Sequence, residues 1–459
     1  MAYSNRLTLS SLAFWSFALS VALLPIGLGG DRPIPLGLAQ AGLALSCICL
    51  ALSPNLWHKL RFFTRLRWAL SLLGIVLLWA FIQTQTFIPI SWVHPLWKEA
   101  ATVLKQPLHG TISVVPEDSL KGISRLFTYI TAGFLGYVFA QDPRRAKQII
   151  QTLWYAGSAI CFYGLMIQIA GLNQVLWFEK TAYIDDLTAT FINHNHFAIY
   201  AGMVLVCGTA LLIQSWREIV GAAKPHHKVA AIRDWVFKKG MIQGLVLVMV
   251  LISIILSNSR AGLSLSLIGL GSYIFFYQIY LHAWRRAWIV GISMLVVVAA
   301  FIGIAASVSD HFAALFSDQS SIDRTRVYDL GWRILQDNPW LGYGINGFEP
   351  EFRLYRQDII PEFNHAHNDI LESLIDLGLP VGLLLWSSIA LIGSGLWHGV
   401  RRRRQNGLFP TLALSVSLMV LAHAMVDFDL QIPGVALTWA ALLGVGLAQS
   451  WRQSEKNVG

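Results

Sequence analysis

Residues 241–281 read MIQGLVLVMVLISIILSNSRAGLSLSLIGLGSYIFFYQIYL and contain a single charged residue, Arg260. As one straight helix, this run of 41 residues would be about 62 Å long at 1.5 Å per residue, twice the ~30 Å hydrocarbon core of a bilayer. The run must therefore fold back on itself. Ser257-Asn258-Ser259 interrupts it near the middle, so the sequence predicts a membrane hairpin with Arg260 at its tip.

The composition of the whole chain points to the same environment. Hydrophobic residues make up 55% of the 459 residues and charged residues only 13%, whereas about 25% is usual for charged residues in soluble proteins. Long apolar runs alternate with short charged loops, which is typical of an integral membrane protein built from α-helices alone. Twelve runs are long enough to cross a bilayer, at residues 7–28, 34–53, 66–84, 123–140, 148–170, 194–214, 240–257, 261–281, 287–308, 379–397, 408–426 and 432–450.

The first run, 7–28, is expected to remain in the protein as a span. A signal peptide ends in a small-x-small cleavage site, whereas Gly29-Gly30-Asp31-Arg32 follows this run. The spans divide the chain into three parts. Residues 1–308 contain spans one to nine, 309–378 form a large polar loop, and 379–459 contain spans ten to twelve.

Lysine and arginine are concentrated in every second loop between the predicted spans. Most of the 34 basic residues fall on this side, among them Arg6, Lys59, Arg144, Lys228 and Arg401. Basic loops remain in the cytoplasm, so both termini are expected there. This distribution accounts for the net charge of +9 and argues against a nucleic-acid partner.

The opposite, extracytoplasmic side carries the acidic loop 309–378. It contains twelve Asp and Glu residues against five Arg and no Lys, a net charge of −7. A loop of this length is usually structured or functional. Apolar residues at helical spacing predict a helix over 323–338, which Pro339 ends. Because soluble nucleotides are absent from this side, chemistry here must use a pre-activated substrate carried by a lipid.

The loop ends in the polar cluster Asn364-His365-Ala366-His367-Asn368-Asp369, directly before an apolar span. Polar, titratable groups at a membrane boundary are costly to keep without a use. A helix is predicted over Asn368–Leu377, with Gly378 as its C-terminal signal. His367 would then lie at the N-terminus of this helix, whose positive end disfavours an imidazolium ion. A neutral imidazole there can accept a proton, and the free N–H groups suit a phosphate.

Each of these residues also has a structural explanation. His367 could only order the loop, and His365 fits that structural role better than a catalytic one. Arg260 could anchor the hairpin at the membrane interface, and Arg324 and Arg326 could form a solvated helix face.

Three blocks of sequence resemble the bacterial O-antigen ligase/O-antigen polymerase superfamily, which also includes pilin O-oligosaccharyltransferases. They are Ser259-Arg260-Ala261-Gly262, then Pro339-x-x-Gly342-x-Gly344-x-x-x-Phe348, then His365-Ala366-His367-Asn368-Asp369-x-Leu371-Glu372 followed by Gly378-Leu379-Pro380. The upstream run Phe191-x-Asn193-x-Asn195-His196-Phe197-Ala198 looks like the segment that precedes them in the superfamily.

The resemblance implies a membrane glycosyltransferase of the GT-C class in the bacterial inner membrane. Its donor would be a glycan on undecaprenyl pyrophosphate, and its acceptor a hydroxyl of lipid A core, a growing glycan or a protein. The reaction would invert configuration and require no metal ion or other cofactor. By this resemblance His367 is the catalytic residue and Arg260 binds the pyrophosphate, while the further substrate-binding candidates are Asn193, His196, Arg324, Arg326, His365, Asn368 and Asp369.

Two departures from ligases keep the polymerase alternative open. Ligases commonly have a second pyrophosphate-binding arginine near the sixth span, where this chain offers Asn193 and His196; Arg324 or Arg326 could replace it. Ligases also tend to carry Gly, Thr or Tyr where this chain has Val381.

Two other classes of protein are weighed against the glycosyltransferase. Twelve spans are typical of transporters and flippases, but those proteins place charge at the bilayer midplane on broken helices, whereas here it collects at one interface. A metal-dependent hydrolase would need His194, His196, His365 and His367 to converge, and no carboxylate is fixed beside them by spacing.

Overall fold

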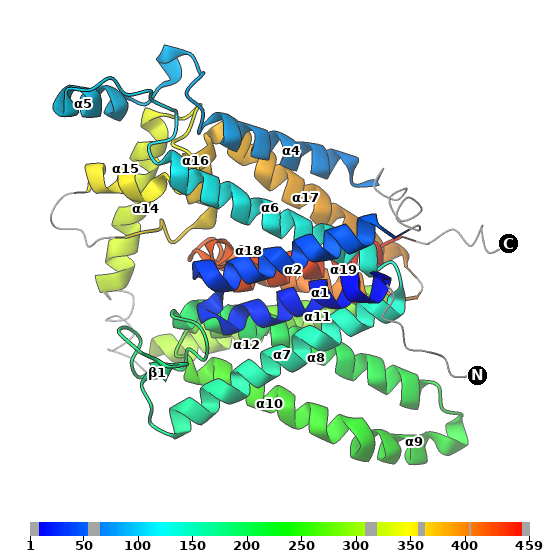
Figure 1. Ribbon diagram of the computed structural model, residues 1–459. Helices are drawn as coiled ribbons and strands as arrows, with labels where there is room; N and C mark the ends of the chain where they lie inside the picture. Colours follow the sequence, from blue (N-terminus) through cyan, green and yellow to red (C-terminus); the bar gives the residue numbers. More distant parts are fainter. Residues whose placement is uncertain (1–8, 54–64, 308–318, 357–362, 404, 452–459) are drawn as a thin grey trace.

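The computed structural model describes residues 9–53, 65–307, 319–356, 363–403 and 405–451 (Figure 1). Arg6 and Lys59, which entered the charge distribution, lie outside the described residues, as do 309–318 and 357–362 of the polar loop. The described residues are mostly helical, and their strands are a short antiparallel pair, β1 (Gln174–Val175) and β2 (Phe178–Glu179). The predicted all-α architecture is therefore confirmed.

A helix lies in each of the twelve ranges predicted to be spans. These helices are α1 (Leu9–Leu23), α2 (Pro33–Ala51), α4 (Arg67–Ile82), α6 (Pro116–Phe139), α7 (Pro143–Ile169), α8 (His194–Trp216), α10 (Met241–Leu256), α11 (Arg260–Tyr280), α12 (Trp284–Ser307), α17 (Leu379–Arg402), α18 (Leu408–His423) and α19 (Pro433–Ala448). Helices outside these ranges are α5 (Pro95–Leu104), α9 (Lys228–Trp235), α14 (Gln319–Asp337), α15 (Phe348–Tyr355) and α16 (Asp369–Leu377).

Seven helical segments of the described residues are long and apolar enough to cross a membrane: Leu9–Ile26, Pro33–Ala51, Pro143–Ile169, His194–Gly221, Pro225–Leu256, Arg260–Tyr280 and Leu379–Arg402. Three more apolar helices, α4, α18 and α19, are shorter. The number of spans therefore stays a prediction, while the class of helical membrane protein is supported. The lipid-compatible surface is clear on α10, where the side chains of Ile242, Leu245 and Val248 are all exposed.

The predicted hairpin is present at the predicted place. α10 ends at Leu256 and α11 begins at Arg260. Asn258 takes a left-handed backbone conformation, with φ of 55°, which Asn tolerates better than most residues. Ser259 caps α11 because its Oγ accepts a hydrogen bond from Gly262 N at 3.0 Å. The turn therefore follows from the polar residues that interrupt the apolar run.

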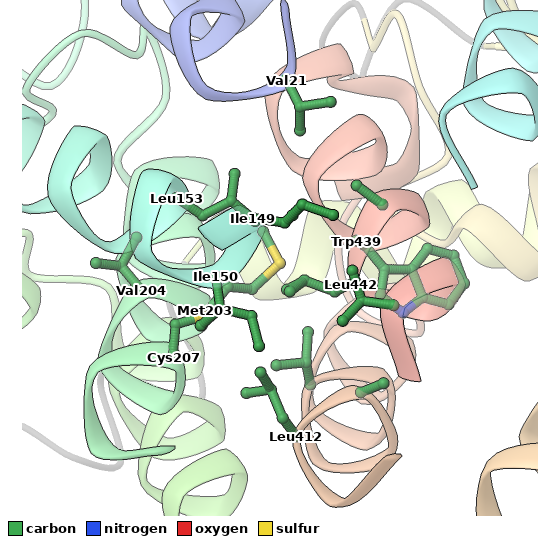
Figure 2. Packing of buried hydrophobic residues seen from close by; sticks show 14 of the residues in the cluster. Val21, Ile149, Ile150, Leu153, Met203, Val204, Cys207, Leu412, Trp439 and Leu442 are labelled. Carbon is green, nitrogen blue, oxygen red and sulfur yellow. The ribbon is translucent and has the colours of Figure 1, made fainter. Parts of the chain in front are cut away.

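α8 lies at the centre of the bundle, and most of its residues are buried. Figure 2 shows its Met203, Val204 and Cys207 packed with side chains of α7, α18 and α19. Small residues allow close approach: a Cβ at Gly208 would lie 2.2 Å from the Trp154 ring. Close packing of small residues is the usual basis of helix association in membranes. The central helix thereby fixes the position of its own N-terminus, which carries His194–His196.

α14, α15 and α16 gather at one end of the bundle, and α9 lies at the other (Figure 1). α14, α15 and α16 enclose a separate apolar cluster that includes Val327, Ile334, Phe348 and Ile375. The predicted helices over 323–338 and 368–377 correspond to α14 and α16. The polar loop is thus a packed helical unit in its described part.

An acidic side chain of α16 holds the connection between α14 and α15 against this unit. Asp376 accepts hydrogen bonds from Asn346 N at 2.9 Å and Phe348 N at 3.1 Å. Gly342 has φ of 69°, and a Cβ there would lie 2.4 Å from the Asp376 carbonyl oxygen. The glycines of this turn are therefore required for packing against the end of α16.

Candidate functional site

His367 occupies the last position before the cap of α16. Asn368 is the N-cap, and its Oδ1 accepts hydrogen bonds from Ile370 N and Leu371 N at 3.1 and 3.0 Å. His367 itself is held at φ of 51°, a conformation that costs free energy in a residue with a Cβ. Tyr328 Oη of α14 donates to the His367 carbonyl at 2.9 Å. The backbone around this imidazole is therefore held from two helices.

The His367 side chain contacts a carboxylate that sequence reasoning missed. His367 Nδ1 lies 3.0 Å from Oδ1 of Asp427, in the connection between α18 and α19. Asp427 Oδ1 also accepts from Phe428 N at 3.0 Å. His196 Nε2 lies 3.7 Å from the same oxygen. Burial alone would raise the pKa of Asp427, but the two imidazoles hold it well below its ordinary value.

This carboxylate determines which nitrogen of His367 can act as a base. An ionised carboxylate only accepts hydrogen bonds, so Nδ1 of His367 carries the hydrogen in that contact. Nε2 then has a free lone pair, and the imidazole side chain is 15% exposed. The arrangement is that of a general base oriented by an acid.

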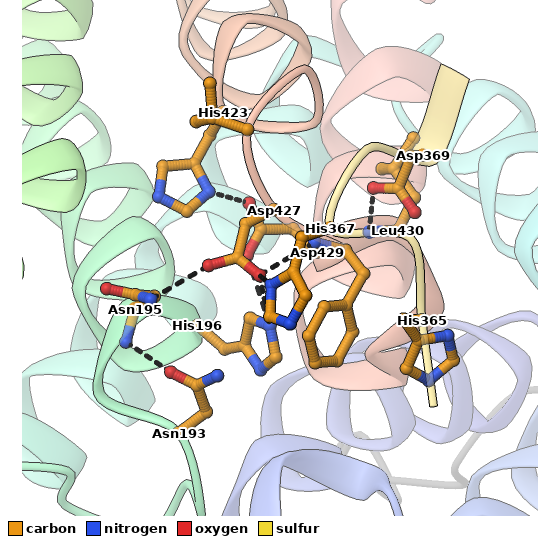
Figure 3. Close-up of polar contacts among 12 residues, drawn as sticks. Asn193, Asn195, His196, His365, His367, Asp369, His423, Asp427, Asp429 and Leu430 are labelled. Atoms are coloured by element: carbon orange, nitrogen blue, oxygen red, sulfur yellow. Dashed lines mark hydrogen bonds and ion pairs between the residues drawn. The ribbon is translucent and has the colours of Figure 1, made fainter. Parts of the chain in front are cut away.

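A chain of hydrogen bonds connects the hairpin tip to His367, and Figure 3 shows the part from Asn195 through Asp427 to His367. Ser259 Oγ donates to Asn195 Oδ1 at 2.6 Å. Asn195 Nδ2 donates to Asp427 Oδ2 at 2.9 Å, and Asp427 contacts His367. Arg260 directly follows Ser259, is exposed, and forms no hydrogen bond or ion pair with another described residue. Its guanidinium therefore has no competing partner among the described residues.

The Phe428 ring is the common surface for three imidazoles. His365 stacks on it at a centroid distance of 4.4 Å, while His196 and His367 meet it edge-on at 4.5 and 4.8 Å. The ring thereby separates His365 from the Asp427 contacts. The two histidines of the polar cluster are thus placed in different surroundings by one aromatic side chain.

His365 is fixed by Glu372, one turn into α16. His365 Nδ1 lies 2.8 Å from Glu372 Oε1, and Ala366 N donates to Glu372 Oε2 at 2.8 Å. Burial alone would lower the pKa of His365, but the Glu372 charge and hydrogen bond raise it above its ordinary value. A protonated His365 would add positive charge near His367. These contacts fit the supporting role expected for His365.

Asp369 is hydrogen-bonded to the connection between α18 and α19, which also carries Asp427. Its backbone N donates to Ala424 O at 2.8 Å, and Leu430 N donates to Asp369 Oδ2 at 3.0 Å. Its other carboxylate oxygen, Oδ1, is buried with no hydrogen-bond partner among the described residues. Burial raises the pKa of Asp369 well above its ordinary value of 3.8.

The remaining predicted residues differ in how close they lie to Asp427. Arg324 Nη1 lies 3.4 Å from the Val426 carbonyl, directly before Asp427. Arg326 lies exposed on α14. Asn193 is the N-cap of α8, with Oδ1 accepting from Asn195 N at 2.8 Å. Their roles in binding substrate stay predictions.

His194 does not join the other three histidines. Its Nδ1 lies 2.8 Å from the Ser257 carbonyl and 2.9 Å from Asp186 Oδ2, and its ring stacks on Tyr183. Within the described ranges, no group of three or more His, Cys, Asp or Glu side chains is arranged to hold a metal ion.

Three further polar residues of the centre had no role in the sequence interpretation: Asn195, His423 and Asp429. His423 Nδ1 contacts Asp429 Oδ2, and both side chains are fully buried. His196 Nε2 lies 3.8 Å from Asp429 Oδ1. The sequence signal that could have pointed to these residues is the pair of acids in Asp427-Phe428-Asp429, which lies between two apolar runs. Acids at a membrane boundary need a partner.

Residues 245–387 match the sequence model of the O-antigen ligase family. This match covers about a third of the chain and supports the O-antigen ligase/polymerase superfamily. The matched region contains Arg260 and His367, and it ends before Asp427. No curated protein matches the chain. Enzymes of this superfamily are glycosyltransferase-like ligases and polymerases that act on lipid-linked glycans, so this chain is a membrane enzyme of that general kind.

Proposed function

We propose that this protein transfers a glycan from undecaprenyl pyrophosphate to an acceptor hydroxyl, with inversion and without a metal ion. The carrying observation is the hydrogen-bonded chain from Ser259 through Asn195 and Asp427 to His367. It couples the position of Arg260 to that of the candidate base. Both lie on the predicted extracytoplasmic face of the bacterial inner membrane, with the termini in the cytoplasm.

In the proposed reaction, the acceptor hydroxyl donates its proton to His367 Nε2. The acceptor oxygen attacks the anomeric carbon from the face opposite the pyrophosphate. The bond from that carbon to the pyrophosphate oxygen breaks, and its electron pair leaves with the pyrophosphate. Asp427 stabilises the imidazolium that forms, so it acts on the reaction through His367.

Arg260 is assigned to the departing pyrophosphate. A planar guanidinium can donate two parallel hydrogen bonds to phosphate oxygens, and Arg260 makes no competing contact with a described residue. Its position at the N-terminus of α11 adds the positive end of the helix dipole. Because pyrophosphate is a good leaving group, positioning and charge stabilisation should contribute more than proton transfer.

The experiment compares His367→Ala, Arg260→Ala and Arg260→Lys in cells and in reconstituted vesicles. We expect loss of surface glycan in both alanine variants at normal protein level. Arg260→Lys should retain part of the activity, because it keeps charge but loses the two-pronged geometry. Arg233→Gln is the control, since Arg233 is an exposed residue of α9, at the other end of the bundle (Figure 1), and lines neither cavity found in the described residues. Normal glycan in both alanine variants would refute the proposal.

A product assay with the purified enzyme distinguishes ligase from polymerase. A ligase attaches one glycan block to a chemically different acceptor, whereas a polymerase lengthens the lipid-linked glycan itself. A ladder of longer lipid-linked products without another acceptor would identify the polymerase.

A further inference from the structure

Two cavities near the polar cluster share one lining residue, Arg125 of α6. One is an apolar groove of about 240 Å³ between α4, α6, α17 and α19. The other is a polar cavity of about 870 Å³ formed by the connection between α1 and α2 with α6 and α15. Among their lining residues, Arg125 alone is common to the two. An apolar groove and a polar cavity that adjoin at one shared residue suit an amphiphilic ligand.

The groove exists because its four helices pack as two close pairs. α6 packs on α19 through glycines: a Cβ at Gly444 would lie 2.1 Å from Gly133 O, and one at Gly136 would lie 2.7 Å from Ala441 O. α4 packs mainly on α17. Between the pairs, the groove follows α6 from Gly122 to Tyr137, about 22 Å at 1.5 Å per residue. It therefore covers most of the ~30 Å thickness of the hydrocarbon core.

Basic side chains near the point where the groove and the polar cavity adjoin differ in their partners. Lys121 pairs with Asp118 at 2.6 Å, and Arg353 with Glu349 at 2.6 Å. Arg125 instead donates to neutral acceptors, Asn346 Oδ1 at 2.9 Å and Gln431 O at 3.5 Å. No carboxylate of the described residues lies within ion-pair distance of its guanidinium. Asp31, which also lines the polar cavity, interacts with the Arg125 charge only beyond ion-pair distance, so an anionic group at hydrogen-bond distance would complete this environment.

Asp369 provides a second polar group at the same end of the groove. It lines the groove, it is 3% exposed, and its Oδ1 has no partner among the described residues. A buried carboxyl oxygen without a hydrogen bond is costly. A headgroup hydroxyl or a phosphate proton in the groove mouth would satisfy it.

The polar cavity approaches the candidate base from the side of His365. His365 lines the cavity and stacks on Phe428, against which His367 also packs. Neither cavity is lined by Arg260, Asn195 or Asp427. The cavity that approaches the centre from Arg125 is therefore lined by residues other than those of the hairpin tip.

We propose that the groove between α4, α6, α17 and α19 holds a hydrocarbon chain of an anionic membrane lipid that serves as the acceptor, and that Arg125 binds its negatively charged headgroup. The assignment as acceptor rests on the proposed glycosyl transfer, in which Arg260 serves the donor. The polar cavity then holds the hydrophilic part of the acceptor, with its hydroxyl directed toward His367.

The test uses the full chain in phosphatidylcholine nanodiscs that contain phosphatidic acid with a photoactivatable group on its acyl chain. After illumination, peptide mapping should place the label on α6 and α19 near Leu126 and Leu443. Arg125→Gln should reduce labelling about tenfold, equivalent to about 1.4 kcal/mol of binding free energy, because a charge-assisted hydrogen bond is lost. Arg125→Lys should restore part of it. Lys98→Gln is the control, since Lys98 is exposed and lines neither cavity.

A second variant and a competitor keep the proposal refutable. Ala440→Phe places a ring in the groove and should reduce labelling while the thermal melting temperature stays normal. Undecaprenyl pyrophosphate should leave labelling of the groove unchanged. Competition by it would overturn the acceptor assignment, and labelling spread evenly over the lipid-facing helices would overturn the site itself. Neither result depends on turnover, so the roles of Arg260 and His367 are tested separately.

Discussion

Replacement of Asp427 by Asn tests the centre most directly, because it removes one charge and almost no volume. The asparagine Oδ1 can still accept from His367 Nδ1 and Phe428 N. Its Nδ2 would face Asn195 Nδ2 at the present 2.9 Å, a contact of two donors that a flip of the Asn195 amide relieves. The hydrogen-bond pattern therefore survives, and the lost quantity is the negative charge beside His367.

The magnitude follows from the distance of 3.0 Å between His367 Nδ1 and Asp427 Oδ1. At an effective dielectric constant of about 20, an imidazolium and a carboxylate at this distance attract by about 5 kcal/mol. Positioned general bases typically contribute about 10²–10⁴ in rate, which is about 2.7–5.4 kcal/mol of activation free energy. We therefore expect Asp427→Asn to lower kcat by about 10²–10⁴, with little change in KM.

The assay is transfer of a labelled glycan from undecaprenyl pyrophosphate in reconstituted vesicles, followed as a function of pH. In Asp427→Asn, kcat should fall over the whole pH range while the folded fraction and KM stay close to those of the wild type. A merely structural role would instead lower the melting temperature and the amount of folded enzyme, with kcat per folded molecule unchanged.

Asp429→Asn is the matched control, since Asp429 lies in the same connection and also contacts an imidazole, that of His423. It should affect stability more than kcat. The reasoning fails if folded Asp427→Asn keeps kcat within about threefold of the wild type, a change of about 0.7 kcal/mol.

Two further predictions concern the packed loop unit. Glu351→Gln should raise the melting temperature by about 1–3 °C at pH 8 but not at pH 4. The reason is that burial raises the pKa of Glu351 from 4.5 to about 7. The cost in stability of ionising Glu351 is therefore absent below pH 4.5, grows up to pH 7 and is complete above it. Gly342→Ala should lower the melting temperature strongly, because its Cβ would lie 2.4 Å from Asp376 O at φ of 69°.

Each of these predictions has a control in the chain. Glu349→Gln should show no such pH dependence, since Glu349 is an exposed partner of Arg353. Gly393→Ala in α17 should be neutral or slightly stabilising, because a Cβ there meets nothing within 4 Å. A Glu351→Gln variant whose stability gain is equal at pH 4 and pH 8 would contradict the assigned burial effect.

The pH argument for Glu351 depends on its surroundings. His94 Nε2 lies 3.6 Å from Glu351 Oε1, close enough to pair if it were charged. Burial lowers the pKa of His94, so the imidazole stays neutral in the pH range where Glu351 ionises. The carboxylate therefore gains little from this neighbour.

Local signals were sufficient for the parts of the fold that depend on short stretches of chain. The 41-residue run of 241–281 is too long for one span, and Ser257-Asn258-Ser259 offers the backbone a turn. The cap at Asn368 and the glycine at Gly378 bound α16 for equally local reasons. The resemblance of the Ser259–Gly262 and His365–Asp369 blocks to the superfamily is confirmed by the family match over 245–387.

The composition of the proposed catalytic centre was only partly accessible from the sequence. His367 was singled out because polar groups at a membrane boundary need a use, and the resemblance assigned roles to it and to Arg260. Asp427 received no role, since it lies between two predicted spans and far from His367 in the chain. Nothing in its local sequence specifies which imidazole it meets.

The sequence by itself thus determined the helices, the hairpin and the two residues nearest the proposed chemistry, because hydrophobic length and helix capping act over a few turns. Only the tertiary structure decided that Asp427 orients His367, that Asn195 links it to the hairpin tip, and that Phe428 separates His365 from His367. Those contacts arise where α8, α11, α16 and α18 converge. Their geometry depends on how whole helices pack, which no single stretch of sequence encodes.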